Sequence, residues 1–368
     1  MRLRLNRIEH YVLGRTLIGV AGALAVFATV IALIDFVELS RTVGGRVDLG
    51  FGQVLLLTVL NAPTLILILL PFSFLFGVLG AFVSLNRRSE LIAMRAAGVS
   101  AWRFIFPAAG AAAVIGVLTV TVLNPIASVM NARFEAMKTE LTQGYRQTRP
   151  QSVWLRQGDE HNQIVIRAHQ RVLGNSSLIL RGVSLFISTR TKDGSVQFSR
   201  RIEAAQAQLM PGYWLLTGAQ EATPGAAAYH FDTLTIPTSL SGDSALERFA
   251  SPQAVPFWGL WRAIARTEQA GFSATGYRLE LQDVLAMPLM FAAMSVLAAA
   301  FSLRLIRLGG LVALAGSGVA LGFVIFFFNE FCRTLGRAGA IPPFAAAWTP
   351  PLIALLAGFT LLCYTEDG

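Results

Sequence analysis

The chain has 368 residues, of which 54% are hydrophobic and only 14% are charged, and its formal net charge at pH 7 is +9. Soluble domains carry about 25% charged residues, so the composition excludes an ordinary soluble protein and indicates a membrane protein. The basic residues form no long arm and no array with aromatic residues that would stack bases, so nucleic acid is excluded as a partner and anionic lipid is expected.

The first part of the chain is predicted to cross the membrane three times. About 20 helical residues span a hydrocarbon core about 30 Å thick. Apolar stretches long enough to do so lie at residues 16–37, 53–85 and 104–123. The second stretch contains Pro63 and Pro71 and exceeds the bilayer, so it is expected to tilt or kink.

From residue 125 to residue 280 the apolar runs shorten, and a water-exposed β domain is predicted. Residues 162–169 and 181–188 alternate polar and apolar side chains, as strands do. Further short strands are expected at residues 153–157, 195–202, 206–210, 213–217 and 229–236. Many short strands without intervening helices favour an antiparallel sandwich.

Three more spans are predicted at residues 281–303, 311–331 and 344–364. The expected fold is therefore an α-helical membrane protein with six transmembrane helices, three on each side of an inserted antiparallel β domain. Its parts are an N-terminal block at residues 1–124, the β domain at 125–280 and a C-terminal block at 281–368.

Arginine clusters set the predicted orientation, because basic loops stay in the cytoplasm. These clusters are Arg2, Arg4, Arg7 and Arg15 before the first span, Arg87, Arg88, Arg95 and Arg103 before the third, and Arg304 and Arg307 after the fourth. Both termini are then cytoplasmic, the first span is retained as an anchor, and the β domain lies outside, in the periplasm of a Gram-negative cell.

The sequence offers no catalytic site. It has no Gly-x-x-x-x-Gly-Lys-Ser/Thr phosphate loop, and the glycine-rich residues 316–322 lie in an apolar helix, where they indicate close helix packing. The four histidines are scattered, and Cys332 and Cys363 are placed near opposite membrane faces. We therefore expect no disulfide, metal or cofactor, and ATP hydrolysis in a separate subunit.

The cytoplasmic segment at residues 86–100 is predicted to contain a short amphipathic surface helix at residues 88–98. Ser89 is expected to cap it, Leu91, Met94 and Ala97 recur at three-residue spacing, and Gly98 is expected to end it.

Two partners fit this helix. Lipid headgroups would hold an ordinary interfacial helix, which usually has a broader face of Leu and aromatic residues. The small side chains of Ala93, Ala96 and Ala97 instead favour close approach by a soluble protein.

Residues 88–100, Arg-Ser-Glu-Leu-Ile-Ala-Met-Arg-Ala-Ala-Gly-Val-Ser, resemble the coupling helix of the LptF/LptG permease family, also called YjgP/YjgQ. Residues 339–343, Gly-Ala-Ile-Pro-Pro, resemble its LptG branch. The layout of three helices on each side of a β domain is similar too, so the resemblance covers nearly the whole chain.

This resemblance implies a permease subunit of the ABC transporter that extracts lipopolysaccharide from the inner membrane and exports it towards the outer membrane. The implied partners are LptF, two copies of the ATPase LptB, and LptC and LptA, which receive the lipid from β-jellyroll domains. The residues implied to contact the ATPase are Arg88, Glu90, Leu91, Met94, Arg95 and Gly98.

The predicted lipid cavity is open sideways to the outer leaflet and is lined by Phe27, Phe323 and Phe327, and Asp35, Arg41 and Arg133 complete the predicted cavity and gate. Family members often carry a basic residue near the outer end of the first helix, but this chain has Asp35 and Glu38 there, which also suit the headgroup level. The residues that can supply the missing positive charge are Arg41, Arg46, Arg133 and Lys138.

Three other interpretations stay open. An LptF-type paralogue would have the same architecture, and a membrane-anchored scaffold or sensor would bind envelope components without an ATPase partner. A lipid-modifying enzyme would need polar catalytic groups at the membrane edge, and the sequence offers few. Proteins and lipids that co-purify with the tagged chain would separate these interpretations.

Overall fold

The computed structural model describes residues 7–44, 50–146, 153–158, 162–173, 178–190, 196–210, 212–238, 252–269, 273–306 and 311–366. These residues form two compact units. The first is helical and comprises Met1–Lys138, Gln253–Leu260 and Thr275–Gly368. The second contains the strands and comprises Thr139–Pro252 and Trp261–Ala274.

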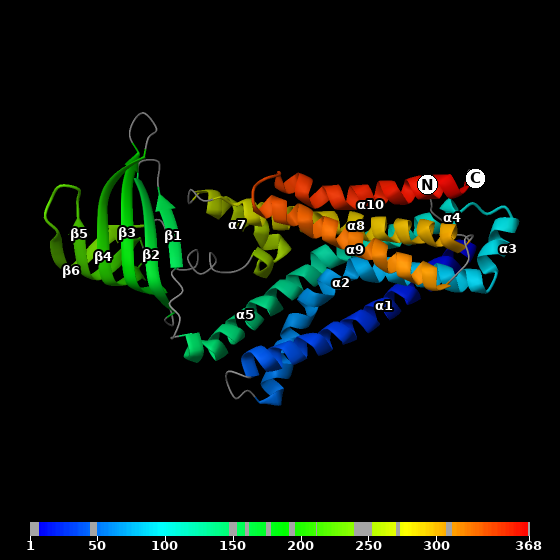
Figure 1. Ribbon diagram of the computed structural model, residues 1–368, viewed down its shortest axis with the longest axis horizontal. Coiled ribbons are helices and arrows are strands. Elements are labelled where there is room, and N and C mark those ends of the chain that lie inside the picture. Colours follow the sequence, from blue (N-terminus) through cyan, green and yellow to red (C-terminus); the bar gives the residue numbers. More distant parts are fainter. Residues whose placement is uncertain are drawn as a thin grey trace. The chain divides into compact units, whose positions relative to one another are not determined.

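The helical unit is built from long apolar helices, as the hydropathy of the sequence predicts (Figure 1). They are α1 (Arg7–Leu39), α2 (Phe51–Arg87), α4 (Trp102–Leu118), α8 (Thr275–Ile306), α9 (Leu311–Arg337) and α10 (Pro343–Glu366), with the short α3 (Glu90–Ala96) between α2 and α4. Within the described residues, five helical stretches are long and apolar enough to cross a membrane, and the 27-residue α9 occupies the place of the other expected span.

Helices also occupy part of the range expected to be β. A π-helical turn (Thr119–Leu123) joins α4 to α5 (Asn124–Arg146), and α7 (Phe257–Gln269) precedes α8. The sequence did not indicate α5 and α7, because both are amphipathic and contain short apolar runs that fit strands as well as helices.

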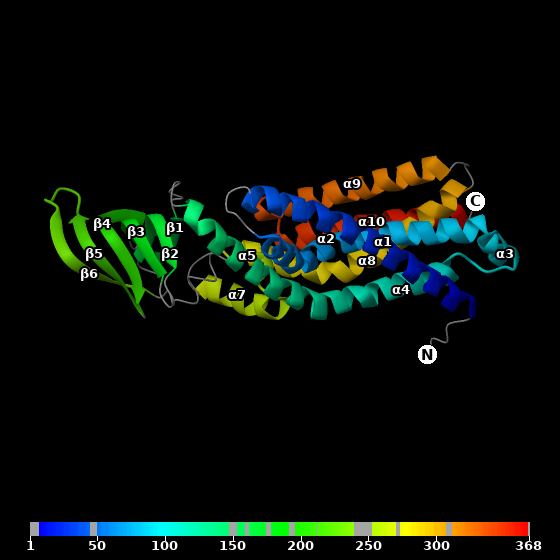
Figure 2. The same cartoon turned by 90° about the horizontal axis from the view of Figure 1, so that it is seen from below.

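One end of the helical unit gathers the start of α1, the end of α10 and the whole of α3, as Figures 1 and 2 both show. The ends of α4 and α8 that adjoin α5 and α7 lie at the other end of this unit. The expected up-and-down order of the spans is consistent with this arrangement.

The buried helix α8 forms the centre of the helical core. In the most apolar 18-residue stretch of α8, 67% of the residues are buried, whereas in the corresponding stretch of the span that contains α1 only 6% are buried. Phe291 of α8 stacks on Phe74 of α2 with ring centroids 5.0 Å apart. A Cβ added to Gly116 of α4 would overlap Pro288 of α8, so this glycine lets the two backbones approach closely.

Glycine also brings α1 and α2 together. A Cβ on Gly19 would overlap the carbonyl oxygen of Gly77, and one on Gly77 would overlap the backbone of Val20. The predicted close packing of the glycine-rich part of α9 is confirmed as well, because a Cβ on Gly318 or Gly322 would lie 3.0 Å from a leucine of α2.

The six strands pair in one antiparallel sheet whose order follows the sequence. They are β1 (Val153–Gly158), β2 (Asn162–Leu173), β3 (Leu178–Arg190), β4 (Val196–Met210), β5 (Tyr213–Ala222) and β6 (Tyr229–Pro237). Antiparallel pairing is confirmed, but in the described strands the expected two-layer sandwich is replaced by a single curved sheet (Figures 1 and 2). Short connections join each strand to its neighbour, and this favours a meander.

A line of irregular pairing crosses the sheet and explains its curvature. In β3 the buried side chains are Leu178 and Leu180 before Gly182, but Val183 and Leu185 after it, so the alternation shifts by one residue. Gly182 has φ of 61°, and its carbonyl oxygen lies 2.7 Å from Nδ1 of His169 in β2. Residues in the left-handed region bend strands and increase their twist.

The same shift occurs in the next strands. In β4 it falls between Ala204 and Ala207, and in β5 between Leu216 and Ala219, where Gly218 has φ of 63°. It also explains why residues 195–202 and 206–210 look like separate strands in the sequence although β4 is continuous.

Gly19→Leu should loosen α1 from α2, because the new side chain has no space against the Gly77 backbone. We expect a loss of about 1–3 kcal/mol, as for other overpacked sites, measured by thermal unfolding in detergent. Gly22→Leu on the same helix is the matched control, because nothing lies within 4 Å of its Cβ position. Equal stability of the two variants would contradict the proposed contact.

Candidate functional site

The helix α3 projects from the end of the helical unit where α1 begins, and Gly98 ends it as predicted. Gly98 has φ of 80°, its backbone N–H donates to Arg95 O at 2.9 Å, and Val99 N–H donates to Met94 O at 3.1 Å. This pair of bonds satisfies the last carbonyls of the helix.

The prediction that Ser89 caps α3 with its side chain is wrong. Ser89 has φ of 59° and its hydroxyl makes no capping bond. Its backbone N–H instead donates to Asn86 O at 2.8 Å. Only two residues separate α2 from α3, so Ser89 must take the left-handed conformation to reverse the chain.

The two faces of α3 have different surroundings. Leu91 is buried and Met94 is half-buried, and both pack into the helical core, so they anchor the helix instead of facing outward. Ile92 is 58% exposed, beside the exposed Ala93 and Ala96. The outward surface is therefore apolar and small. Sequence reasoning missed Ile92. In a helix, Leu91 and Met94 lie on one face and the residue after Leu91 points to another, so the exposure of Ile92 could have been predicted.

Polar contacts tie α3 to the start of α1. The Tyr11 hydroxyl donates to Oε2 of Glu90 at 2.9 Å, and Arg15 Nε donates to the Tyr11 hydroxyl at 3.2 Å. Nearby on α1, Glu9 pairs with Arg103 of α4 at 3.3 Å. The carboxylate of Glu90 is thus held at the surface by a neighbour in its own chain. Arg88 is exposed and Arg95 is partly exposed in the last turn of α3.

At the other end of α1, Asp35 is bound to α2. Its Oδ1 accepts from Asn61 Nδ2 at 3.0 Å, a partner that sequence reasoning did not identify. Arg41, in the π-helical turn after α1, and Arg133, on α5, are both exposed. Lys138 lies over the Phe134 ring, 5.0 Å from its centroid. Arg46 lies outside the described residues.

The three predicted cavity phenylalanines lie in two groups, one on α1 and one on α9. Phe27 of α1 packs edge-on against Phe76 of α2 with centroids 5.5 Å apart. On α9, Phe323 and Phe327 stack with centroids 6.1 Å apart and are 56% and 65% exposed. The ring contact that joins α9 to α2 is between Phe326 and Phe72, at 5.6 Å.

The outward faces of α1 and α9 are apolar and uncovered within the described chain. On α1 they include Ile18, Val26, Val30 and Leu33. These exposed faces, beside the aromatic groups, suit acyl chains or another apolar helix.

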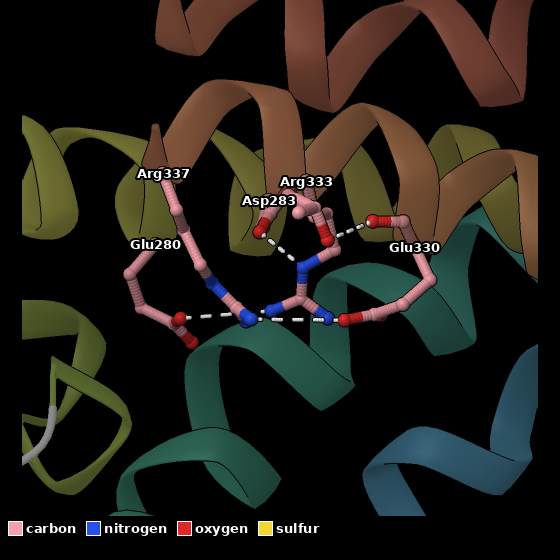
Figure 3. Close-up of polar contacts among 6 residues, drawn as sticks. Glu280, Asp283, Glu330, Arg333 and Arg337 are labelled. Carbon is pink, nitrogen blue, oxygen red and sulfur yellow. Dashed lines mark hydrogen bonds and ion pairs between the residues drawn. The ribbon is translucent and has the colours of Figure 1, made fainter. Parts of the chain in front are cut away.

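A cluster of charges joins α8 to α9, and sequence reasoning missed it (Figure 3). Arg333 Nε lies 2.8 Å from Asp283 Oδ2, and its Nη2 lies 3.8 Å from Glu280 Oε2. Arg337 lies 3.6 Å from Glu330 along α9. The signal was present, because Glu280 and Asp283 are three residues apart and Glu330, Arg333 and Arg337 share one helix face.

Burial separates the two parts of this cluster. The side chains of Glu280 and Asp283 are each 12% exposed and that of Arg333 is 23% exposed. Glu330 and Arg337 are 43% and 48% exposed. A buried charge needs a partner, so Arg333 is the residue that makes two carboxylates tolerable between α8 and α9.

The chain is similar to known proteins over almost all of its length. Residues 10–364 match the family described as lipopolysaccharide export system permease LptF/LptG. The lipopolysaccharide export system permease protein LptG of Haemophilus influenzae is 24% identical over 377 residues, which cover 99% of this chain and 100% of that protein. The protein of the same name from Escherichia coli K12 is 25% identical over 347 residues, or 90% of each chain.

Arg333→Gln should destabilise the α8–α9 contact by about 3–5 kcal/mol, because it leaves two buried carboxylates without their cation. Arg337→Gln, in the exposed pair, should cost less than about 1 kcal/mol. Thermal unfolding in detergent measures both. Adding Asp283→Asn to Arg333→Gln should recover part of the loss, and a single Arg333→Gln variant as stable as Arg337→Gln would refute the role of this ion pair.

Proposed function

The chain belongs to the LptF/LptG family of lipopolysaccharide export permeases, and we propose that it is the LptG-type transmembrane subunit of an ABC transporter. In this proposal it extracts lipopolysaccharide from the inner membrane and passes it to a periplasmic bridge. The names of both compared relatives favour LptG over the paralogous LptF. The observation that carries the proposal is the exposed α3 surface at the end of an apolar bundle.

The proposed orientation follows from the arginine clusters. The end that holds α3, the start of α1 and the end of α10 faces the cytoplasm, because the basic residues gather there. The β domain is inserted between α5 and α7 and therefore faces the periplasm. The domain boundaries proposed from the sequence keep this order of helical block, β domain and helical block.

ATP hydrolysis is assigned to a separate LptB dimer, because the sequence contains no phosphate-binding loop. The outward face of α3 is the docking surface. Ile92 supplies an apolar anchor, Ala93 and Ala96 allow close approach, and Arg88 with Glu90 supplies charges at the rim. The Tyr11 contact to Glu90 gives movement of α3 a direct route to α1.

The lipid enters between apolar helix faces. A second permease of the same family, LptF, is proposed to pair with this chain so that the exposed faces of α1 and α9 border a cavity open to the membrane. Moving an acyl chain from the lipid to these faces costs little free energy, because both environments are apolar. Work is done when ATP binding favours a collapsed cavity that binds the lipid more weakly.

The β domain is proposed to shield the acyl chains afterwards, on the way to LptC and LptA. One face of its sheet is apolar from β2 to β6, with Trp214, Leu216, Ile202 and Leu185 among its buried residues. Such a face keeps acyl chains out of water.

Glu90→Lys should reduce recovery of the ATPase with the tagged permease about tenfold, because a reversed charge at a docking surface costs at least about 1.4 kcal/mol. Pull-down from native membranes measures it. Tyr11→Phe is the matched control: it removes the intrachain partner of Glu90 but keeps the carboxylate. Full ATPase recovery with Glu90→Lys, or an equal loss with Tyr11→Phe, would refute docking through Glu90.

A photo-crosslinking amino acid at Phe327 should capture lipopolysaccharide in cells, since this side chain lies on the proposed cavity face and is 65% exposed. The control is Val114, which is 60% exposed on α4, on the opposite side of the helical unit from α9 (Figure 2). Phospholipid adducts are expected at both positions and lipopolysaccharide adducts mainly at Phe327. Equal lipopolysaccharide capture at the two sites would argue against a defined cavity on α9.

A further inference from the structure

The helix α7 (Phe257–Gln269) has two sharply different faces. Phe257, Leu260 and Ala263 are buried. The opposite face exposes Trp258 and Trp261, at 59% and 57%, followed by the exposed Arg262 and Arg266. Two exposed tryptophans on one helical turn are costly in water, at about 25 cal/mol per Å² of apolar surface.

The first turn of α7 is hydrogen-bonded to the chain at the point where the apolar third span passes into the more polar α5. Phe257 N–H donates to Asn124 Oδ1 at 3.0 Å, and Trp258 Nε1 donates to Thr121 O at 3.3 Å. Thr121 lies in the apolar π-helical turn that ends α4, and Asn124 begins the more polar α5. The apolar length of the third span therefore ends where α7 starts.

We propose that α7 lies in the headgroup layer of the leaflet at this end of the bundle, with Trp258 and Trp261 between the headgroups and Arg262 and Arg266 on lipid phosphates. Tryptophan favours this layer because its ring is apolar and its N–H is polar. The arginine guanidinium matches phosphate oxygens in charge and geometry. Both kinds of side chain on one amphipathic face indicate a helix that lies on a membrane.

This role is independent of the cargo and of the ATPase. In sequence, α7 lies between the last strand and the re-entry of the chain into the membrane at α8. A helix attached to lipid there holds the segment that leads into α8 at the membrane surface. The occupant of the exposed face is the phosphate-bearing bilayer, and a protein partner on this face is the alternative that the experiment separates.

Tryptophan fluorescence of the full chain in nanodiscs tests the placement. The signal of interest is the difference between the natural chain and Trp258→Phe/Trp261→Phe. We expect it to be quenched by lipids brominated near the glycerol end of the acyl chain, less by lipids brominated near the terminal methyl, and weakly by aqueous iodide. The difference signal of Trp214→Phe is the control, because Trp214 is buried in the sheet.

The arginine contacts are tested with a small fraction of brominated anionic lipid in zwitterionic nanodiscs. This lipid should quench the α7 signal more than the same fraction of brominated zwitterionic lipid does. The reason is that each arginine should enrich anionic lipid beside α7 about fivefold. Arg262→Gln/Arg266→Gln should remove this difference and keep the shallow quenching.

Two results would overturn the proposal. Quenching of the α7 signal by iodide alone would place this face in water, and absence of quenching by iodide and by both lipids would place a protein against it. Neither result bears on ATPase docking at α3, so failure here leaves the transporter assignment to its own tests.

Discussion

The close approach of helix backbones at glycine is the contact on which the bundle depends. Hydrocarbon offers apolar side chains the same surroundings that a protein core does, so burial of leucine holds no helices together there. Gly19 against Gly77, and Gly116 against Pro288, instead bring backbone to backbone and gain dispersion contacts. α1 packs on one side against α2 and α4, and the opposite apolar face stays free for lipid or a second subunit.

Polar contacts then fix the two ends of the bundle. At one end, Tyr11 and Glu90 join α1 to α3, and Glu9 and Arg103 join α1 to α4. At the other, Arg333 joins α9 to α8. Between these contacts α1 and α9 expose apolar faces, which are the faces proposed to border the lipid cavity. The ATPase proposed to dock on α3 would act on α1 through the hydrogen bond between Tyr11 and Glu90, which can break and reform at little cost.

Hydropathy alone predicted the long helices, because a span of hydrocarbon dictates the length and composition of the segment that crosses it. The glycine preference of helix ends predicted that Gly98 ends α3, since the residue there takes the left-handed conformation. Sequence reasoning failed where backbone geometry overrides local preference. Ser89 reverses the chain instead of capping a helix, and the shift of alternation at Gly182 and Gly218 split one strand into two and hid the single curved sheet. The segment of the surface helix α3 was predicted, but not its buried face, because Leu91 and Met94 were expected to meet a partner and pack inward. The Arg333 cluster emerges only when two helices are brought together.

The central claim is that this apolar bundle moves lipopolysaccharide with energy supplied by another protein at α3. Mass spectrometry of the proteins and lipids that co-purify with the tagged chain from native membranes tests it most directly. The account predicts an ATP-binding subunit, a second permease of the same family and bound lipopolysaccharide in one complex. Recovery of the folded chain alone, with phospholipid as its only lipid and no nucleotide-binding partner, would contradict it.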